Sequence, residues 1–187
     1  MPRISRVTTR TGDDGTTGLG GGQRIPKDAP RIAALGAVDE LSSAVGLALA
    51  AGVTPATGQR LRAVQNDLFH LGADLCVLEA EKASRPGPRI DPRHVQALDG
   101  VIEELTNTLP ALENFVLPGG APAAAALHMA RALCRRAERA VVALSRAEAI
   151  GPQIVLYLNR LSDALFLLAR QENRAAGEPD VVWDSRA

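Results

Sequence analysis

The chain of 187 residues is poor in cysteine, in aromatic residues and in net charge. Cys76 and Cys134 are its two cysteines, too few for a disulfide framework or a four-thiolate metal site, so a reducing compartment fits best. Its 21 basic and 21 acidic side chains cancel, so global charge favours binding neither to nucleic acid nor to an anionic membrane. Aromatic residues make up 3% of a chain that is 46% hydrophobic, and this bias towards alanine and leucine favours helices over a β-sandwich.

An uninterrupted apolar segment long enough to span a membrane is also missing. The longest charge-free stretch, residues 41–59, contains Gly46, Gly52 and Pro55 and therefore predicts a packed helix followed by a turn. The first ten residues carry three arginines without an apolar core. We therefore expect no secretory signal and a cytoplasmic protein.

Apolar residues recur at alternating spacings of three and four through most of the chain, which is the pattern of helices that pack through one face. Five helices are expected: one at about 30–51, three that carry the apolar stripes 61–78, 95–109 and 127–144, and one at about 152–174. Glycine and proline mark the breaks, and no break is long enough for a domain linker. The sequence predicts one all-α domain over 1–187: an up-and-down five-helix bundle over 30–174 with antiparallel neighbours, an opening loop over 1–29, and a tail over 175–187.

The opening segment, residues 8–27, is rich in glycine and threonine and carries Arg10 and Lys27. Glycines let backbone amides approach an anion and threonines add hydroxyl donors, as a polyphosphate-binding loop requires. No Gly-Lys-Ser/Thr follows the glycines and no strand pattern precedes them, so the segment is neither a Walker A motif nor a dinucleotide fingerprint. A solvated N-terminal loop has the same composition, so both interpretations stand at this point.

The fourth predicted helix contains four arginines and a single acid within nine residues: Arg131, Arg135, Arg136, Glu138 and Arg139. Arg131, Arg135 and Glu138 stand at i, i+4 and i+7 and share one helix face. A solvated face and an anion-binding site both explain this cluster, and the segment alone leaves the two open.

Polar residues also occur beside apolar stripes elsewhere. Asp39 follows Val38 on the apolar side of the first helix, which favours pairing with an arginine across the bundle. Asn159 and Asp163 share a face of the fifth helix, where surface hydrogen bonds and a functional role are equally compatible. We predict no protein-bound metal, because metal-ligand spacing is lacking among the three histidines His70, His94 and His128.

Five segments resemble successive motifs of one enzyme family. They are Thr9 to Gly15, Arg31 to Gly46, Phe115 to Gly120, Arg131 to Arg139, and Tyr157 to Asp163. Together they resemble the ATP:cob(I)alamin adenosyltransferases of the PduO type over about residues 8–183. The resemblance implies a five-helix bundle and a homotrimer with active sites between subunits. It also implies transfer of the 5′-deoxyadenosyl group of ATP to the cobalt of cob(I)alamin, giving adenosylcobalamin and triphosphate.

Matched motif by motif, the resemblance assigns residues to ATP and to the corrinoid. ATP would contact Thr9, Arg10, Thr11, Gly12, Thr17, Gly18, Lys27, Arg135, Arg136, Glu138, Arg139 and Asn159. The catalytic group would be Asp39, Phe115, Arg131 and Arg135, with Phe115 on the lower face of the corrinoid, where it would exclude the axial ligand. Mg²⁺ would accompany ATP, and a cobalamin reductase and an adenosylcobalamin-dependent client enzyme would be partners. Arg10 stands where the family often has lysine, so its phosphate contact can differ.

Two other functions are compatible with the same residues. A nucleotidyl or phosphoryl transferase would use the nucleotide site on another small molecule, and phosphoryl transfer would not release triphosphate. A non-enzymatic protein would be a helical scaffold or a carrier of adenosylcobalamin. The glycine-rich loop and the arginine cluster argue against a bare scaffold, whereas a carrier role is compatible with catalysis.

Overall fold

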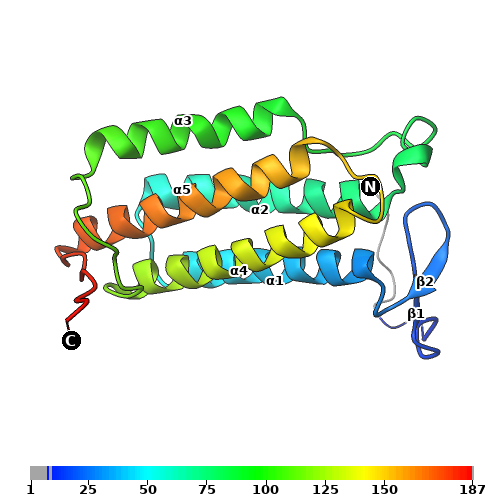
Figure 1. The fold of residues 1–187 in the computed structure, drawn as a ribbon, viewed down its shortest axis with the longest axis horizontal. Helices are drawn as coiled ribbons and strands as arrows, with labels where there is room; N and C mark the ends of the chain where they lie inside the picture. Colours follow the sequence, from blue (N-terminus) through cyan, green and yellow to red (C-terminus); the bar gives the residue numbers. More distant parts are fainter. Residues whose placement is uncertain (1–7, 9, 187) are drawn as a thin grey trace.

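The computed structural model describes residue 8 and residues 10–186, and shows a helical bundle with a small hairpin at one end (Figure 1). Its helices are α1 Pro30–Ala50, α2 Pro55–Cys76, α3 Pro92–Thr108, α4 Pro122–Ser145 and α5 Gln153–Ala176. A short 3-10 helix, η1 Glu79–Glu81, lies between α2 and α3. The predicted all-α, five-helix architecture is confirmed.

Proline, aspartate and glycine set several helix ends. Proline occupies the first turn of α1, α2, α3 and α4, where no amide hydrogen is needed and the fixed φ suits a helix start. At α3, the Asp91 side chain accepts a hydrogen bond from the amide of Arg93 at 3.0 Å, and the Asp91 amide donates to His94 Nδ1 at 3.1 Å. α5 ends at Gly177, whose φ of 74° is a left-handed conformation that glycine adopts without strain.

Consecutive helices alternate in direction along the chain, as an up-and-down bundle requires (Figure 1). α1 packs against α2 and α4, and α5 packs against α4 and α3. The α3–α5 pair is parallel, so the expectation that all neighbours are antiparallel is wrong for this pair. The physical reason is the connection over residues 77–91, which is long enough to carry the chain from α2 to the far side of the bundle.

The core is aliphatic and follows the predicted stripes. Leucines at these positions are fully or almost fully buried: Leu61, Leu68, Leu71 and Leu75 on α2, and Leu158, Leu161, Leu165 and Leu168 on α5. α1 is long and apolar enough to cross a membrane by length and composition alone. It nevertheless buries Ala34, Leu41 and Val45 completely between its neighbours, as the core helix of a bundle does.

Residues 16–26 form an antiparallel hairpin where the sequence predicted only a loop. Its strands are β1 Thr16–Gly18 and β2 Arg24–Pro26, with Thr17 opposite Ile25. The turn depends on Gly22, whose φ is 93° and whose amide donates to the carbonyl of Leu19 at 2.9 Å. Leu19 is buried, and the amide of Gly20 donates to the carbonyl of Cys76 at 2.8 Å, which joins the hairpin to the end of α2. One apolar side chain is too small a signal for periodicity to reveal.

Candidate functional site

Gly12 and Lys27, two residues predicted to bind ATP, meet at the base of the hairpin. A Cβ atom added at Gly12 would lie 3.0 Å from Lys27 Nζ and 3.2 Å from the carbonyl oxygen of Thr16. The Lys27 amide donates to the carbonyl of Gly15 at 2.9 Å. The ammonium group of Lys27 therefore lies against glycine backbone. An anion site needs both features, a positive charge and a backbone that the anion can approach closely.

Arg24, which the sequence analysis did not single out, organises the same segment. Its Nε donates to Thr16 Oγ1 at 3.0 Å, and its guanidinium also donates to the carbonyl of Thr11. Arg10 has a φ of 58°, in the left-handed region that non-glycine residues seldom adopt. The other predicted residues of this segment, Thr17 and Gly18, lie on β1, and Thr9 lies outside the described residues.

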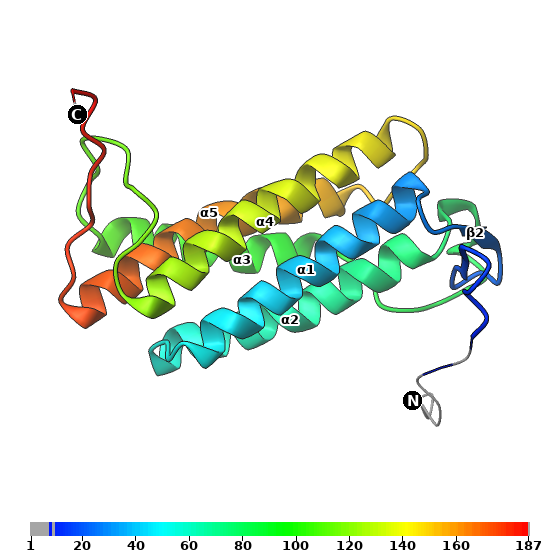
Figure 2. The ribbon, with the colours of Figure 1, turned by 90° about the horizontal axis from the view of Figure 1, so that it is seen from below.

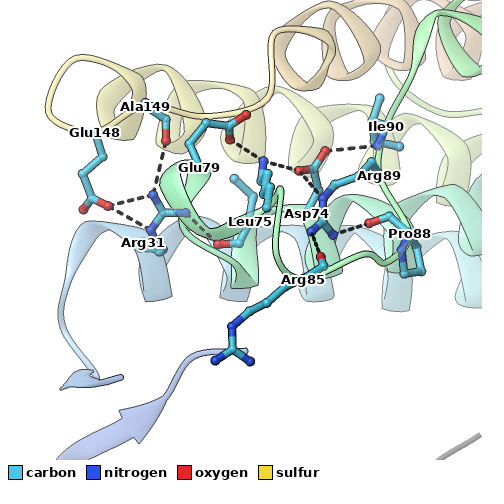
Figure 3. A network of polar contacts seen from close by, with 11 residues as sticks. Arg31, Asp74, Leu75, Glu79, Arg85, Pro88, Arg89, Ile90, Glu148 and Ala149 are labelled. Carbon is cyan, nitrogen blue, oxygen red and sulfur yellow. Dashed lines mark hydrogen bonds and ion pairs between the residues drawn. The ribbon is translucent and has the colours of Figure 1, made fainter. Parts of the chain in front are cut away.

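A buried polar network supports the hairpin end of the bundle (Figure 3). Arg31 is 2% exposed and donates to Glu148 Oε2 at 2.7 and 2.9 Å and to the carbonyl of Leu75 at 2.7 Å. Asp74 is equally buried and accepts from the amide of Ile90 at 3.1 Å. These contacts tie the start of α1 to the end of α2, to the α2–α3 connection and to the residues that follow α4. The network therefore holds together the end of the bundle that lies next to the hairpin.

The predicted arginine cluster lies along the seam between α4 and α5. Arg131 Cζ is 6.0 Å from the centroid of the Phe166 ring, and Asn159 Nδ2 donates to Glu138 Oε1 at 3.2 Å. In both pairs the α4 residue lies beside the α5 residue that antiparallel helices would place there. Arg135 lies between the two pairs along α4. Glu138 and Asn159, both predicted to contact ATP, are thus brought together.

Among the described residues, Arg136 is the one arginine of the cluster with a carboxylate partner. Arg135 and Arg139 are exposed, and Arg139 Nη1 donates to the backbone carbonyl of Arg135 at 3.2 Å. Arg136 differs, because it forms an ion pair with Glu40 on α1. Arg135 and Arg139 therefore offer charge to a phosphate group, whereas the charge of Arg136 is already balanced within the chain.

His128 lies buried beside this seam. It is 2% exposed, and neither ring nitrogen has a hydrogen-bond partner among the described residues. Its ring centroid is 5.9 Å from that of Phe166. Burial and the nearby Arg131 lower the pKa of His128, while Asp180 acts in the opposite direction. The imidazole is therefore mainly neutral at neutral pH and extends the uncharged surface of Phe166.

Phe115 belongs to a pair of segments that we call the aromatic strap, residues 114–117 and 181–183. They lie at the end of the bundle opposite the hairpin (Figure 2). The amide of Trp183 donates to the carbonyl of Phe115 at 2.7 Å, and the amide of Leu117 donates to the carbonyl of Val181 at 2.7 Å. The Phe115 and Trp183 ring centroids are 6.3 Å apart, and Phe115 is 77% exposed. The strap thus presents an aromatic ring to solvent.

Buried polar side chains of α5 hold the strap in place. Arg170 Nε donates to Asp180 Oδ2 at 2.7 Å and Nη2 donates to the carbonyl of Pro110 at 2.8 Å. Asn173 lies so close to Gly120 that an added Cβ would be 2.1 Å from its Oδ1 atom. Gly120 also has a φ of 93°. The glycine that follows the Phe115 segment is therefore required both by conformation and by close approach.

Asp39 does not meet Arg131 within this chain, so the expected pairing across the bundle is not made there. Asp39 is exposed and lines an apolar groove between α1 and α2, together with Phe69, which is 72% exposed. Its neighbour Glu40 is the residue that reaches α4, because successive helix positions point about 100° apart. Arg131 Nε is buried without a hydrogen-bond partner among the described residues.

Comparison with known proteins relates this geometry to an enzyme family. The family model described as "Cobalamin adenosyltransferase" matches residues 7–172. The chain belongs to the cobalamin adenosyltransferase family. A cobalamin adenosyltransferase of Cupriavidus metallidurans is 46% identical over 185 residues, 97% of this chain and 95% of that protein. A corrinoid adenosyltransferase of Mycobacterium tuberculosis is 45% identical over 184 residues, 96% of this chain and 93% of that protein.

Solved structures of cobalamin adenosyltransferases share the fold. A phenylalanine-to-alanine variant of the PduO-type ATP:corrinoid adenosyltransferase from Lactobacillus reuteri, complexed with cobalamin and ATP, superposes with a TM-score of 0.91. It is 36% identical in sequence, and the match covers 96% of this chain and 100% of that chain. An arginine-to-lysine variant complexed with ATP has a TM-score of 0.88 at 35% identity, with 95% and 100% covered. The PduO-type resemblance and the helical-bundle fold are confirmed.

Sequence reasoning missed several residues of this adenosyltransferase that shape the candidate site. His128 was considered only as a metal ligand, and Phe166 and Trp183 carried no periodic or motif signal. Asp180 lies in the predicted tail and gains its importance from the buried partner Arg170. The signal that could have indicated two of them is the scarcity of aromatic residues, since Phe166 and Trp183 are two of the five in the chain.

Proposed function

We propose that the chain transfers the 5′-deoxyadenosyl group of ATP to the cobalt of cob(I)alamin and releases triphosphate. The observation that supports this most is the α4–α5 seam. It combines Arg135 and Arg139, which form no ion pair among the described residues, with the partly exposed ring of Phe166, against which the buried and neutral His128 packs. The arginine cations suit a polyphosphate, and the uncharged ring suits the broad apolar face of a corrinoid.

The reaction is an in-line displacement in which reduced cobalt attacks the 5′-carbon of ATP. Cobalt is the nucleophile, so the chain needs neither a general base nor a nucleophilic side chain. Cys134 is unsuited to nucleophilic attack, because burial raises the pKa of its thiol and its Sγ lies 3.2 Å from the carbonyl oxygen of Leu158. The chain's task is to align the reacting atoms and to stabilise charge on the departing triphosphate.

We assign the triphosphate to the free cations of the hairpin and of α4. Lys27 lies over the Gly12 backbone, and Arg135 and Arg139 are exposed on α4. We also assign Mg²⁺ to the bound ATP. The carboxylate of Glu138, about one helical turn from Arg135, is an oxygen ligand of the kind that Mg²⁺ takes, and the phosphates would supply others.

We assign Phe115 to the lower face of the corrinoid. The aromatic strap holds this ring in solvent through two backbone hydrogen bonds of 2.7 Å. A ring placed there would exclude water and the lower axial ligand from cobalt. A four-coordinate centre accepts an electron more readily, so the ring would make the reduction of cob(II)alamin easier.

We propose that each active site is shared between subunits of a homotrimer. The hairpin and the aromatic strap lie at opposite ends of one chain (Figures 1 and 2). α4 runs between these ends, and its 24 residues correspond to about 36 Å. One ATP molecule placed against the hairpin would therefore not bring its 5′-carbon to the strap of the same chain. A neighbouring subunit would also bring Asp39 to the unpartnered Arg131 Nε.

Subunit mixing tests the shared site. Gly12→Arg perturbs the hairpin base, because a Cβ there would lie 3.2 Å from the Thr16 carbonyl oxygen and the added cation would face Lys27, and Arg135→Ala removes a cation from α4. Each variant alone should have strongly reduced activity, and mixed trimers should regain part of the activity. Demonstrably mixed trimers that regain no activity would show that the hairpin and Arg135 of each site belong to the same chain.

The reaction itself is tested by mixing purified protein with ATP and chemically reduced cobalamin. We expect the corrinoid spectrum to change to that of adenosylcobalamin with release of one equivalent of triphosphate. Release of inorganic phosphate or pyrophosphate instead would support a phosphoryl or nucleotidyl transferase. A cytoplasmic location, a cobalamin reductase as electron donor and an adenosylcobalamin-dependent client enzyme as acceptor complete the proposal.

A further inference from the structure

We propose that Asp67, His70 and His94 bind one divalent transition-metal ion, with Zn²⁺ as the best match. Asp67 and His70 share a face of α2 at i and i+3, and His94 lies in the first turn of α3. One ligand atom from each residue lies within 4.8 Å of those from the other two. The prediction that the histidines lack a metal-ligand arrangement considered their spacing along the chain, whereas the fold brings two of them together.

The distances in this cluster suit a small ion after minor side-chain movement. His94 Nε2 lies 3.8 Å from Asp67 Oδ1, and the rings of His70 and His94 meet edge to face with centroids 5.7 Å apart. Ligand atoms bound at about 2.0–2.1 Å to tetrahedral zinc lie roughly 3.3 Å from one another. Shifts of about 1 Å in side-chain position therefore close the site around an ion.

Two features distinguish the cluster from an ordinary polar contact. His70 Nδ1 is buried without a hydrogen-bond partner among the described residues, which is costly unless another group binds it. The atoms of Asp67 and His94 that would not bind the ion also have polar partners, as is usual for metal ligands. Asp67 Oδ2 accepts from the Tyr157 hydroxyl at 3.1 Å, and His94 Nδ1 lies 3.1 Å from Asp91 Oδ1. Metal binding at His94 Nε2 would place the ring proton on Nδ1, where Asp91 Oδ1 would accept it in place of the bond from the Asp91 amide.

The donor set decides the kind of ion. Two imidazoles and one carboxylate suit Zn²⁺, whereas Mg²⁺ and Ca²⁺ take oxygen ligands. Three protein ligands leave one tetrahedral position for water. The ion would connect α2 to the start of α3, which otherwise packs on α5, so it would act as a clamp between helices that are joined by a long connection.

The metal site is separate from the candidate active site. Tyr157 of α5 contacts Asp67 on α2, whereas Asn159, two residues further along α5, contacts Glu138 on α4. Residues two apart on a helix point in nearly opposite directions. Zinc binding can therefore be measured without ATP or a corrinoid, and its failure would leave the proposed adenosyl transfer untouched.

Calorimetric titration of chelator-treated, tag-free protein with Zn²⁺ tests the proposal. We expect one Zn²⁺ per chain, and in a parallel titration Co²⁺ should give the intense visible absorption of a four-coordinate ion. His70→Gln and Asp67→Asn should each weaken zinc binding at least about tenfold. His128→Gln is the matched control, because it removes the histidine that lies outside the cluster. Zinc should also raise the Tm of the parent but not that of His70→Gln.

Two results would overturn the metal site. One is the absence of zinc binding by the parent protein. The other is equal zinc affinity in the parent, His70→Gln and Asp67→Asn, which would mean that the ion binds elsewhere on the surface. Because His94 also caps α3, the decision rests on the two α2 variants, which leave that cap in place.

Discussion

Asp180→Ala should destabilise the protein by about 3 kcal/mol and release the aromatic strap. Arg170 Nε lies 2.7 Å from Asp180 Oδ2, and the two side chains are 5% and 19% exposed. Removing one partner of a buried ion pair costs about 3–5 kcal/mol, because the remaining charge stays buried. The lower end applies here, since Arg170 keeps its hydrogen bond to the carbonyl of Pro110 at 2.8 Å and Asp180 is partly accessible to water.

Urea unfolding followed by circular dichroism measures the change in the free energy of unfolding. Trp183 is the only tryptophan in the chain and lies against Phe115, so its fluorescence emission should shift to longer wavelength when the strap is released. Arg170→Met combined with Asp180→Ala should recover part of the lost stability, because no unpaired charge then remains buried. A loss below about 1 kcal/mol, the range of surface ion pairs, with unchanged emission would refute the reasoning.

Three further substitutions test the site. Arg135→Ala should weaken ATP binding by about 1.5–3 kcal/mol, the contribution of a charge-assisted hydrogen bond, when measured by calorimetry. Phe115→Ala should slow adenosylation far more from cob(II)alamin than from pre-reduced cob(I)alamin, and should remove the four-coordinate cob(II)alamin spectrum seen with ATP. His128→Gln should flatten the pH dependence of stability in urea unfolding below pH 6.5. The pKa of His128 is lowered from 6.5 in the folded state, so protonation favours the unfolded chain, and stability that is complete above 6.5 is lost as the pH falls.

Each of these substitutions has a control or a contradicting outcome. Arg62→Ala removes an exposed arginine from α2 and should leave ATP affinity unchanged. Leu112→Ala removes an exposed apolar side chain near Phe115 and should leave the cob(II)alamin spectrum intact. Unchanged ATP affinity in Arg135→Ala would make the α4 cluster structural, and a persistent four-coordinate spectrum in Phe115→Ala would make that ring a turn anchor. An unchanged acid slope in His128→Gln would show that the histidine does not drive the loss of stability.

Local patterns in the sequence were sufficient for the number and approximate position of the helices, although α2 and α4 begin at Pro55 and Pro122, before their apolar stripes. The stripe that runs from Leu61 to Leu75 predicts a helix because spacings of three and four place every member on one face. These leucines are the ones buried in α2. Proline and glycine predict the ends for an equally local reason, since they act on the backbone of their own residue and its neighbours.

The sequence motifs identified the family and the residue types of the candidate site, but they did not show how these residues are arranged in space. Glu138 and Asn159 were both expected to contact ATP, and the seam brings them to 3.2 Å. Asp39 was expected to pair with an arginine across the bundle, yet it lines a groove between α1 and α2. Side chains at adjacent helix positions point about 100° apart. The sequence pattern does not show which neighbouring helix each of them faces.

The sequence by itself determined the helices, the glycine-rich opening and the cationic face of α4, because each depends on residues close together in the chain. Only the tertiary structure decided that α3 packs parallel to α5, that the tail residue Asp180 pairs with Arg170, and that His70 meets His94. These contacts join different helices, or join a helix to the tail that folds back on it. Their geometry depends on how whole helices pack together, which no single segment encodes.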